Sequence, residues 1–184
     1  MGGIHRSAHR KASPKPSGVP TAYVMQPFEV KLDYRGRSWC TVAFELGHKE
    51  IGDAEEPEYR LAHDLAELFS EVGLDAPRPI PVLRADHQIA QKLHALSAAG
   101  SERAHDLVDL QILAAGEPVG LLLTKATCTR LFEYRRQQEW PPRIAIGDRW
   151  DALYEDAADG LDVLATVDEA IVWVNDFIAR IAQS

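Results

Sequence analysis

Residues 86–110, DHQIAQKLHALSAAGSERAHDLVDL, read as two amphipathic helices around a Gly-Ser turn. In each helix, four residues follow the i, i+3, i+4, i+7 spacing of a single face. These residues are Ile89, Lys92, Leu93 and Leu96 in the first helix, and Asp106, Asp109, Leu110 and Leu113 in the second. One lysine and two aspartates therefore stand where packing favours leucine. The stretch predicts helices near 86–99 and 102–115 that run antiparallel as a hairpin.

The predicted helical hairpin brings its charged side chains to one level. Gly100 and Ser101 fit a helix stop followed by an N-cap. Lys92 lies about 12 Å before this turn and Asp109 about 13 Å after it, at the rise of an α-helix. A partly buried lysine needs a partner, because isolated buried charge is costly. Two interpretations stay open: a salt bridge between helices without chemistry, or a lysine that neutralises a substrate phosphate while an aspartate orients it or assists proton transfer.

A β-hairpin is predicted upstream, at residues 27–46, PFEVKLDYRGRSWCTVAFEL. Apolar and polar residues alternate on both sides of a YRGR turn, in which Gly36 is available for positive φ. Such alternation indicates strands with one buried face. Two strands alone are marginal in water, and RPIPVLR at 78–84 is a candidate third strand, which its prolines confine to an edge.

The rest of the chain is predicted to be helical. Further periodic segments lie near 57–72, 119–138, 148–158 and 165–182, with WPPRIAIGDRW as a loop between the second and the third. The fold class is therefore α+β, a small antiparallel sheet followed by a helical bundle. We divide the chain into a disordered basic arm at 1–20, a β/α portion at 21–84 and a helical bundle at 85–184.

Composition narrows the class of protein. The formal net charge is −8, which argues against wholesale coating of nucleic acid. Residues 1–20 carry four Lys and Arg and no acid, which leaves −12 for residues 21–184. This basic segment is either a solvated tail or an arm that touches RNA phosphates. Two cysteines give no disulfide or zinc pattern, and no apolar run is long enough for a bilayer, so we expect a cytoplasmic protein with no membrane partner.

Three stretches carry a resemblance to a known family. IAQKLHAL at 89–96, followed by RAHDLVDLQIL at 103–113, resembles the lysine and Arg/Asp hallmark of the AbiEii/AbiGii nucleotidyltransferase toxins. FEVKLDYRGRSWCTVAFELG at 28–47 looks like the hairpin that this family places upstream. WPPRIA at 140–145 resembles a segment of the mycobacterial toxins of this group. The resemblance covers roughly residues 26–150.

The resemblance implies a transferase that uses a nucleoside triphosphate, Mg²⁺ and the tRNA acceptor end, and that an antitoxin restrains. By position, Lys92 would contact the triphosphate, and Asp109 would be the supporting acid, with Asp106 and Arg103 beside it. Glu45, on the return strand of the hairpin, would be a third carboxylate near the metal. An ordinary outward-facing strand residue is the alternative for Glu45.

One element of the family pattern is not found. The family begins with Gly-Ser and an Asp-x-Asp pair that holds metal ions, whereas residues 1–26 contain no acid. We expect a truncated start, an inactive relative or one part of a split protein, and each predicts weak or absent transfer by this polypeptide. Missing strands would also leave a sheet edge open to a partner or to a second copy.

Two other functions compete with the transferase. The first is a non-catalytic interaction module that binds an antitoxin or RNA. The second is an HD-type metal phosphohydrolase, suggested by the doublets His63-Asp64 and His105-Asp106, to which His87 and His94 could be recruited. The β-hairpin is foreign to that all-helical architecture.

Overall fold

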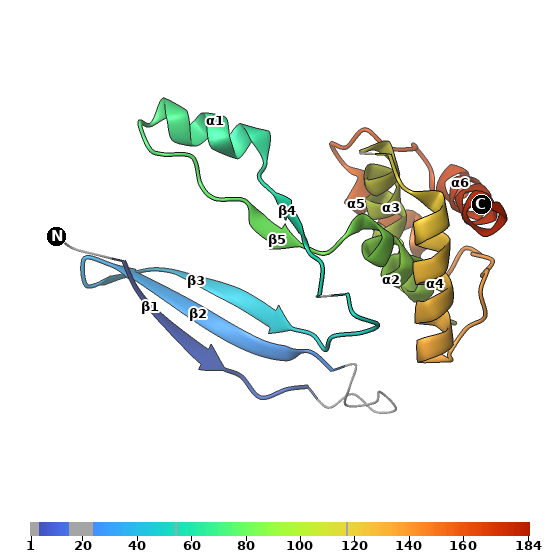
Figure 1. The fold of residues 1–184 in the computed structure, drawn as a ribbon, viewed down its shortest axis with the longest axis horizontal. Coiled ribbons are helices and arrows are strands. Elements are labelled where there is room, and N and C mark those ends of the chain that lie inside the picture. The colour runs from blue at the N-terminus through green and yellow to red at the C-terminus, as the bar shows by residue number, and fades with distance from the viewer. Residues whose placement is uncertain (1–3, 15–23, 54, 117) are drawn as a thin grey trace. The chain divides into compact units, whose positions relative to one another are not determined.

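The hairpin forms as the alternating pattern predicts. The computed structural model describes residues 4–14, 24–53, 55–116 and 118–184 (Figure 1). Strands β2 (Gln26–Tyr34) and β3 (Arg37–Leu46) pair in antiparallel register. Arg35 and Gly36 take φ values of 52° and 75° at the turn, the left-handed conformations that a two-residue hairpin loop of type I′ requires.

The third strand of this sheet comes from the N-terminal segment. β1 (Ile4–Arg10) pairs with β2, so the sheet order is β1-β2-β3. This corrects the expectation of disorder for residues 4–10, and the remaining part of that basic arm from residue 15 to 20 lies outside the described residues. The pairing escaped sequence analysis because it depends on a partner strand far along the chain. Association of two copies through a sheet edge stays a prediction.

A second, smaller ribbon replaces part of a predicted helix. β4 (Glu58–Arg60) pairs with β5 (Ile80–Val82), so residues 58–60 are a strand, and α1 (His63–Glu71) begins later than predicted. The strand at 80–82 therefore forms as expected but joins β4 rather than the hairpin. Tyr59 lies opposite Pro81, a pairing that an edge strand tolerates.

The helical bundle contains the main hydrophobic core. α2 packs against α3 and α4, and α6 packs against α3, α4 and α5. Their bounds are α2 (Ala85–Leu96), α3 (His105–Ala115), α4 (Leu121–Arg135), α5 (Trp150–Ala158) and α6 (Val167–Gln183). A capping box of Thr166 and Glu169 fixes the start of α6. On α6, Val167 and Ile178 are buried, and Val174 and Ile181 have no exposed surface.

The chain divides into two compact units, residues 1–50 and 51–184. β4, α1 and β5 belong to the second unit, together with the helices. The expected boundary at residue 84 between a β/α portion and a helical bundle stays a prediction. The α+β class is confirmed, with the antiparallel sheet in the first unit and the helical bundle in the second. Within the described residues, no helix is both long and apolar enough to cross a membrane.

Candidate functional site

Lys92 and the two aspartates meet across the α2–α3 hairpin. The Nζ atom of Lys92 donates to Asp106 Oδ1 at 2.9 Å and to Asp109 Oδ2 at 2.5 Å. The helix spacing predicted that these side chains would face one another. The turn itself differs from the prediction, because Ser101 is not the N-cap of α3: that position is Ala104, and the Ser101 hydroxyl donates to the carbonyl of Ala95 at 2.9 Å.

Asp106 is the buried centre of this charged cluster. Its side chain has no exposed surface, and its second oxygen accepts from Arg103 Nε at 2.7 Å. Both oxygens of the carboxylate therefore hold a cation: Oδ1 accepts from Lys92 and, at 3.3 Å, from Arg103 Nη2, and Oδ2 accepts from Arg103 Nε. Burying a carboxylate is costly unless it is paired and hydrogen-bonded, and this arrangement supplies both.

The cluster opens to solvent on one side. The side chains of Lys92, Asp109 and Arg103 are 21%, 44% and 51% exposed. The partly exposed Lys92 and Arg103 can bind an anionic group such as a phosphate. Both can still pair with the buried carboxylate of Asp106 while they do so. The arrangement thus combines a fixed anchor with accessible positive charge.

The electrostatics keep both cations charged. Burial disfavours the ammonium of Lys92, but its hydrogen bonds to Asp109 and Asp106 outweigh burial and raise the pKa of this lysine. The hydrogen bond to Asp106 likewise raises the pKa of Arg103. Lys92 is therefore a positive contact at neutral pH and not a general base.

The comparisons with known proteins point to one family. The family model described as nucleotidyl transferase AbiEii toxin, type IV toxin–antitoxin system, matches residues 3–173. This chain belongs to that family. A toxin–antitoxin family implies an antitoxin partner for this AbiEii-family protein. No curated protein in the comparison matches the chain.

The other residues predicted for a site in the AbiEii-family protein lie on several different elements. Glu45 is an exposed residue of β3, opposite Pro27, and belongs to the first unit. His105 Nε2 lies 3.8 Å from Asp106 Oδ1 at the surface of α3. Among the described residues, no three His, Cys, Asp or Glu side chains form a group that could hold a metal. The HD-type centre, which also needs the His63 side chain outside the described residues, stays a prediction.

The cluster does not fit a magnesium pair held by the protein. Both oxygens of Asp106 are already engaged by cations, and Asp109 shares one oxygen with Lys92. Asp109 is therefore the one carboxylate of the cluster with an oxygen that no cation engages. One such oxygen is too few for two magnesium ions, because each ion usually takes one or two protein carboxylates beside substrate phosphates.

A second polar network in the AbiEii-family protein was missed by sequence analysis. Asp86, at the start of α2, is buried, accepts from Thr127 Oγ1 at 2.6 Å and pairs with Arg84 Nε at 3.0 Å. Burial opposes ionisation of Asp86, but these hydrogen bonds from Thr127 and Arg84 lower its pKa. The network borders a hollow of about 230 Å³ that Arg130 and His87 also line. Thr127 is 41 residues away from Asp86, so no local pattern could have revealed the pair.

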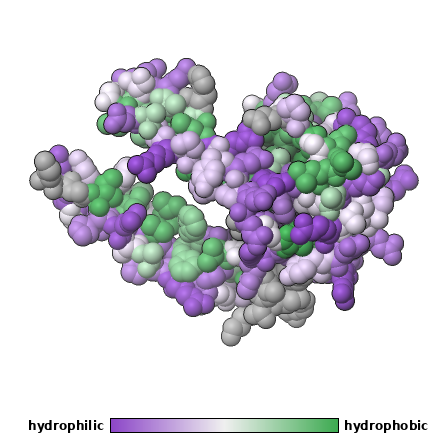
Figure 2. Space-filling view, in the orientation of Figure 1, coloured by the Kyte–Doolittle hydropathy of each residue, from purple (hydrophilic) through white to green (hydrophobic). Residues whose placement is uncertain are grey.

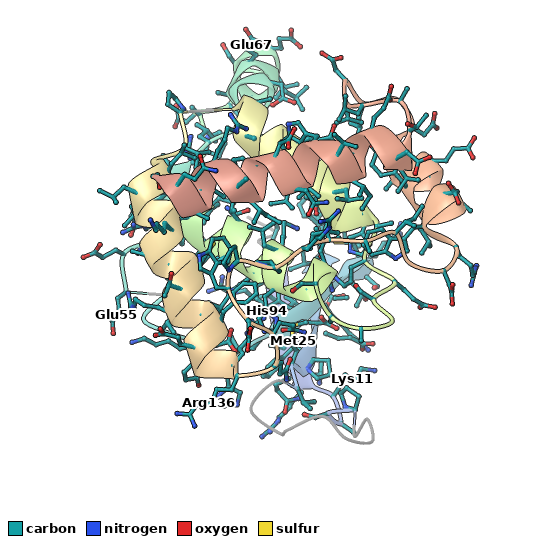
Figure 3. All side chains as sticks on the ribbon, turned by 90° about the vertical axis from the view of Figure 1, so that its right-hand side faces the viewer. Lys11, Met25, Glu55, Glu67, His94 and Arg136 are labelled. Atoms are coloured by element: carbon teal, nitrogen blue, oxygen red, sulfur yellow. The ribbon has the colours of Figure 1, made fainter. Side chains whose placement is uncertain are left out.

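His94 is a further buried polar side chain, and its burial leads us to expect that the folded protein is less stable at acid pH. Figure 3 shows His94 within the bundle and Arg136 outside it, beyond the end of α4. The ring is 4% exposed and accepts from Arg135 Nη1 at 3.3 Å, while Nε2 has no partner among the described residues. Burial, and then the charge of Arg135, lower the pKa of His94 to about 4.

We therefore expect stability to fall as the pH decreases through the window between about 6.5 and about 4. Unfolded His94 takes a proton there while the folded residue does not, so the unfolding free energy drops by about 2–3 kcal/mol by about pH 4.5. Urea denaturation at neutral and acid pH measures this change. His94→Gln removes the titrating group, and a variant with the same pH dependence as the parent would contradict the prediction.

Proposed function

We propose that this protein transfers a nucleotide from a nucleoside triphosphate to the acceptor end of tRNA, with the cluster of Lys92, Arg103, Asp106 and Asp109 as its phosphate-handling site. The observation that carries the proposal is the position of Lys92, whose ammonium is held on a buried carboxylate while its side chain stays 21% exposed. Membership of a nucleotidyl transferase toxin family supports the reaction class.

In the proposed reaction, a tRNA hydroxyl oxygen attacks the α-phosphorus of the triphosphate. An oxygen–phosphorus bond forms, the bond to the bridging oxygen of the β-phosphate breaks, and pyrophosphate leaves with that oxygen. Lys92 and Arg103 neutralise the charge of the phosphates, which is the main requirement of such transfers. The hydroxyl proton goes to solvent or to the exposed carboxylate of Asp109. Magnesium and Glu45 are proposed on the resemblance alone, and omission of the ion and Glu45→Ala test them.

Lys92→Ala should reduce transfer at least about 100-fold, because one charge-assisted contact to the phosphates is lost. The assay follows transfer of each radiolabelled nucleoside triphosphate to tRNA by the full chain. The protein should still fold, since Arg103 continues to hold Asp106. A thermal melt of Lys92→Ala checks this, and loss of the melt would favour a purely structural salt bridge.

Lys125→Ala is the matched control. This lysine lies on α4 in the same unit, and its Nζ donates to the carbonyl of Ser184 at 2.8 Å, outside the charged cluster. Its replacement should leave transfer within about twofold of the parent. If the parent labels tRNA and Lys92→Ala labels it equally, the role of Lys92 is wrong. If the parent labels no tRNA with any nucleotide, transfer by this chain is wrong, and the interaction module remains.

A further inference from the structure

The two units carry opposite charge. Residues 1–50 hold eight Lys and Arg against four Asp and Glu, a formal charge of +4, which leaves −12 for residues 51–184 in a chain of net charge −8. Within β1 and the residues up to 14, there are three Lys and Arg, two histidines and no acid. A polyanion is therefore attracted to the sheet unit and repelled by the helical unit.

Basic and aromatic side chains share one face of the sheet. Residues that lie directly opposite each other in neighbouring strands point to the same side. The register aligns Arg10 with Phe28, and Phe28 with Phe44, in one row across the three strands. A parallel row aligns Arg6 with Leu32. Neighbouring strands are about 4.8 Å apart, so arginines border the β1 side of this face and Phe44 borders the β3 side, about 10 Å away.

These side chains are accessible. Every residue of β1 is exposed, and Phe44 on β3 is 57% exposed. Figure 2 shows hydrophobic residues along the surface of this sheet, bordered by hydrophilic ones. Arg6 makes no hydrogen bond or ion pair with the described residues, and Arg10 uses its Nε to contact Gln26 at 2.7 Å, which leaves its other donors open.

From this juxtaposition we propose that the sheet of β1, β2 and β3 is a binding surface for single-stranded nucleic acid. Arg6 and Arg10 contact backbone phosphates, and an unpaired base stacks on Phe44. Exposed aromatic rings beside a basic strand suit unpaired bases, since the bases of a duplex already stack on one another. The surface lies in the unit that does not contain Lys92, and its binding does not depend on nucleotide transfer.

The test is fluorescence anisotropy of a labelled single-stranded RNA of about 12 nucleotides, with the full chain and without nucleoside triphosphate. The variant Arg6→Glu/Arg10→Glu should weaken binding at least about tenfold at low salt. Its log–log salt dependence should also be shallower by about 1.4, the value expected for two lost phosphate contacts on a single strand. The matched control, Arg78→Glu/Arg143→Glu, makes the same charge change at exposed positions of the helical unit and should alter binding by less than about twofold.

Phe44→Ala provides a second, charge-neutral variant. Loss of one stacking platform should weaken binding about tenfold without changing the salt dependence. Circular dichroism shows whether each variant keeps its strands, and Phe44→Ala tests the surface even where the double arginine variant does not fold. A DNA strand of the same sequence distinguishes a general single-strand surface from one that reads the 2′-hydroxyl, and binding of either supports the proposal.

The proposal would be overturned if the parent chain showed no measurable binding, or if the arginine variant and its control lost the same affinity. Equal affinity of the parent for duplex RNA or for anionic phospholipid vesicles would also overturn it, because binding would then depend on bulk charge alone. Lys92→Ala separates this proposal from the transfer reaction. It should bind the oligonucleotide as the parent does while it loses transfer, so either proposal can fail while the other stands.

Discussion

Asp106→Ala is expected to lower the free energy of unfolding by about 3–5 kcal/mol, because it leaves two cations without the buried carboxylate that holds them. The Asp106 side chain has no exposed surface and accepts from Lys92 at 2.9 Å and from Arg103 at 2.7 Å. Lys92, only 21% exposed, would keep its contact to Asp109 but lose the inner partner. Urea denaturation at neutral pH measures the change.

Asp109→Ala is the control for this result. Its carboxylate contacts the same lysine but is 44% exposed, and ion pairs that are open to solvent contribute about 0–1 kcal/mol. The two aspartates sit on one face of one helix, so helix propensity and position hardly differ between the variants. Equal losses for Asp106→Ala and Asp109→Ala would contradict the assignment of Asp106 as the buried anchor.

Trp150→Ala is expected to cost about 3–5 kcal/mol of unfolding free energy, the usual range for a large aromatic side chain removed from a core. Trp150 begins α5 and is 1% exposed, and its Nε1 donates to the carbonyl of Ser101 at 2.6 Å. It therefore ties α5 to the connection between α2 and α3, the hairpin that carries the charged cluster. Thermal or chemical denaturation measures the loss.

Trp150→Phe separates packing from the hydrogen bond. The smaller ring keeps most of the buried apolar surface but leaves the Ser101 carbonyl without its donor, so the expected loss is about 1–3 kcal/mol. Trp173→Ala is a second comparison, because this residue is only partly buried against the core and should cost less than Trp150→Ala. A Trp150→Ala protein as stable as the parent would contradict the position of this side chain in the core.

Much of the fold was predictable because its signals are local. The period of two at β2 and β3, with Gly36 in the turn, defines a hairpin from adjacent residues. The helical spacing around Lys92 likewise predicts that this lysine faces Asp109. The resemblance to the AbiEii toxins rested on these same residues, and the family model that matches residues 3–173 confirms it.

The incorrect predictions of secondary structure have one physical cause: these segments form strands because they pair with residues far away in the sequence. The basic segment Ile4–Arg10 has too few apolar residues to indicate a strand, yet its backbone pairs with β2 along one side. Residues 58–60 look helical by period but pair with Ile80–Val82. Local propensity is weak compared with such pairings, so tertiary contacts override it.

The sequence alone determined the helices, the hairpin and the choice of residues at the charged cluster, since periodicity and residue type are properties of neighbouring positions. Only the tertiary structure decided how deeply each charge lies. It placed Asp106 out of water and left Asp109 at the surface, although the two share a helix face and a residue type. Burial depends on what packs over a side chain from elsewhere in the chain, and that information is absent from any single stretch of sequence.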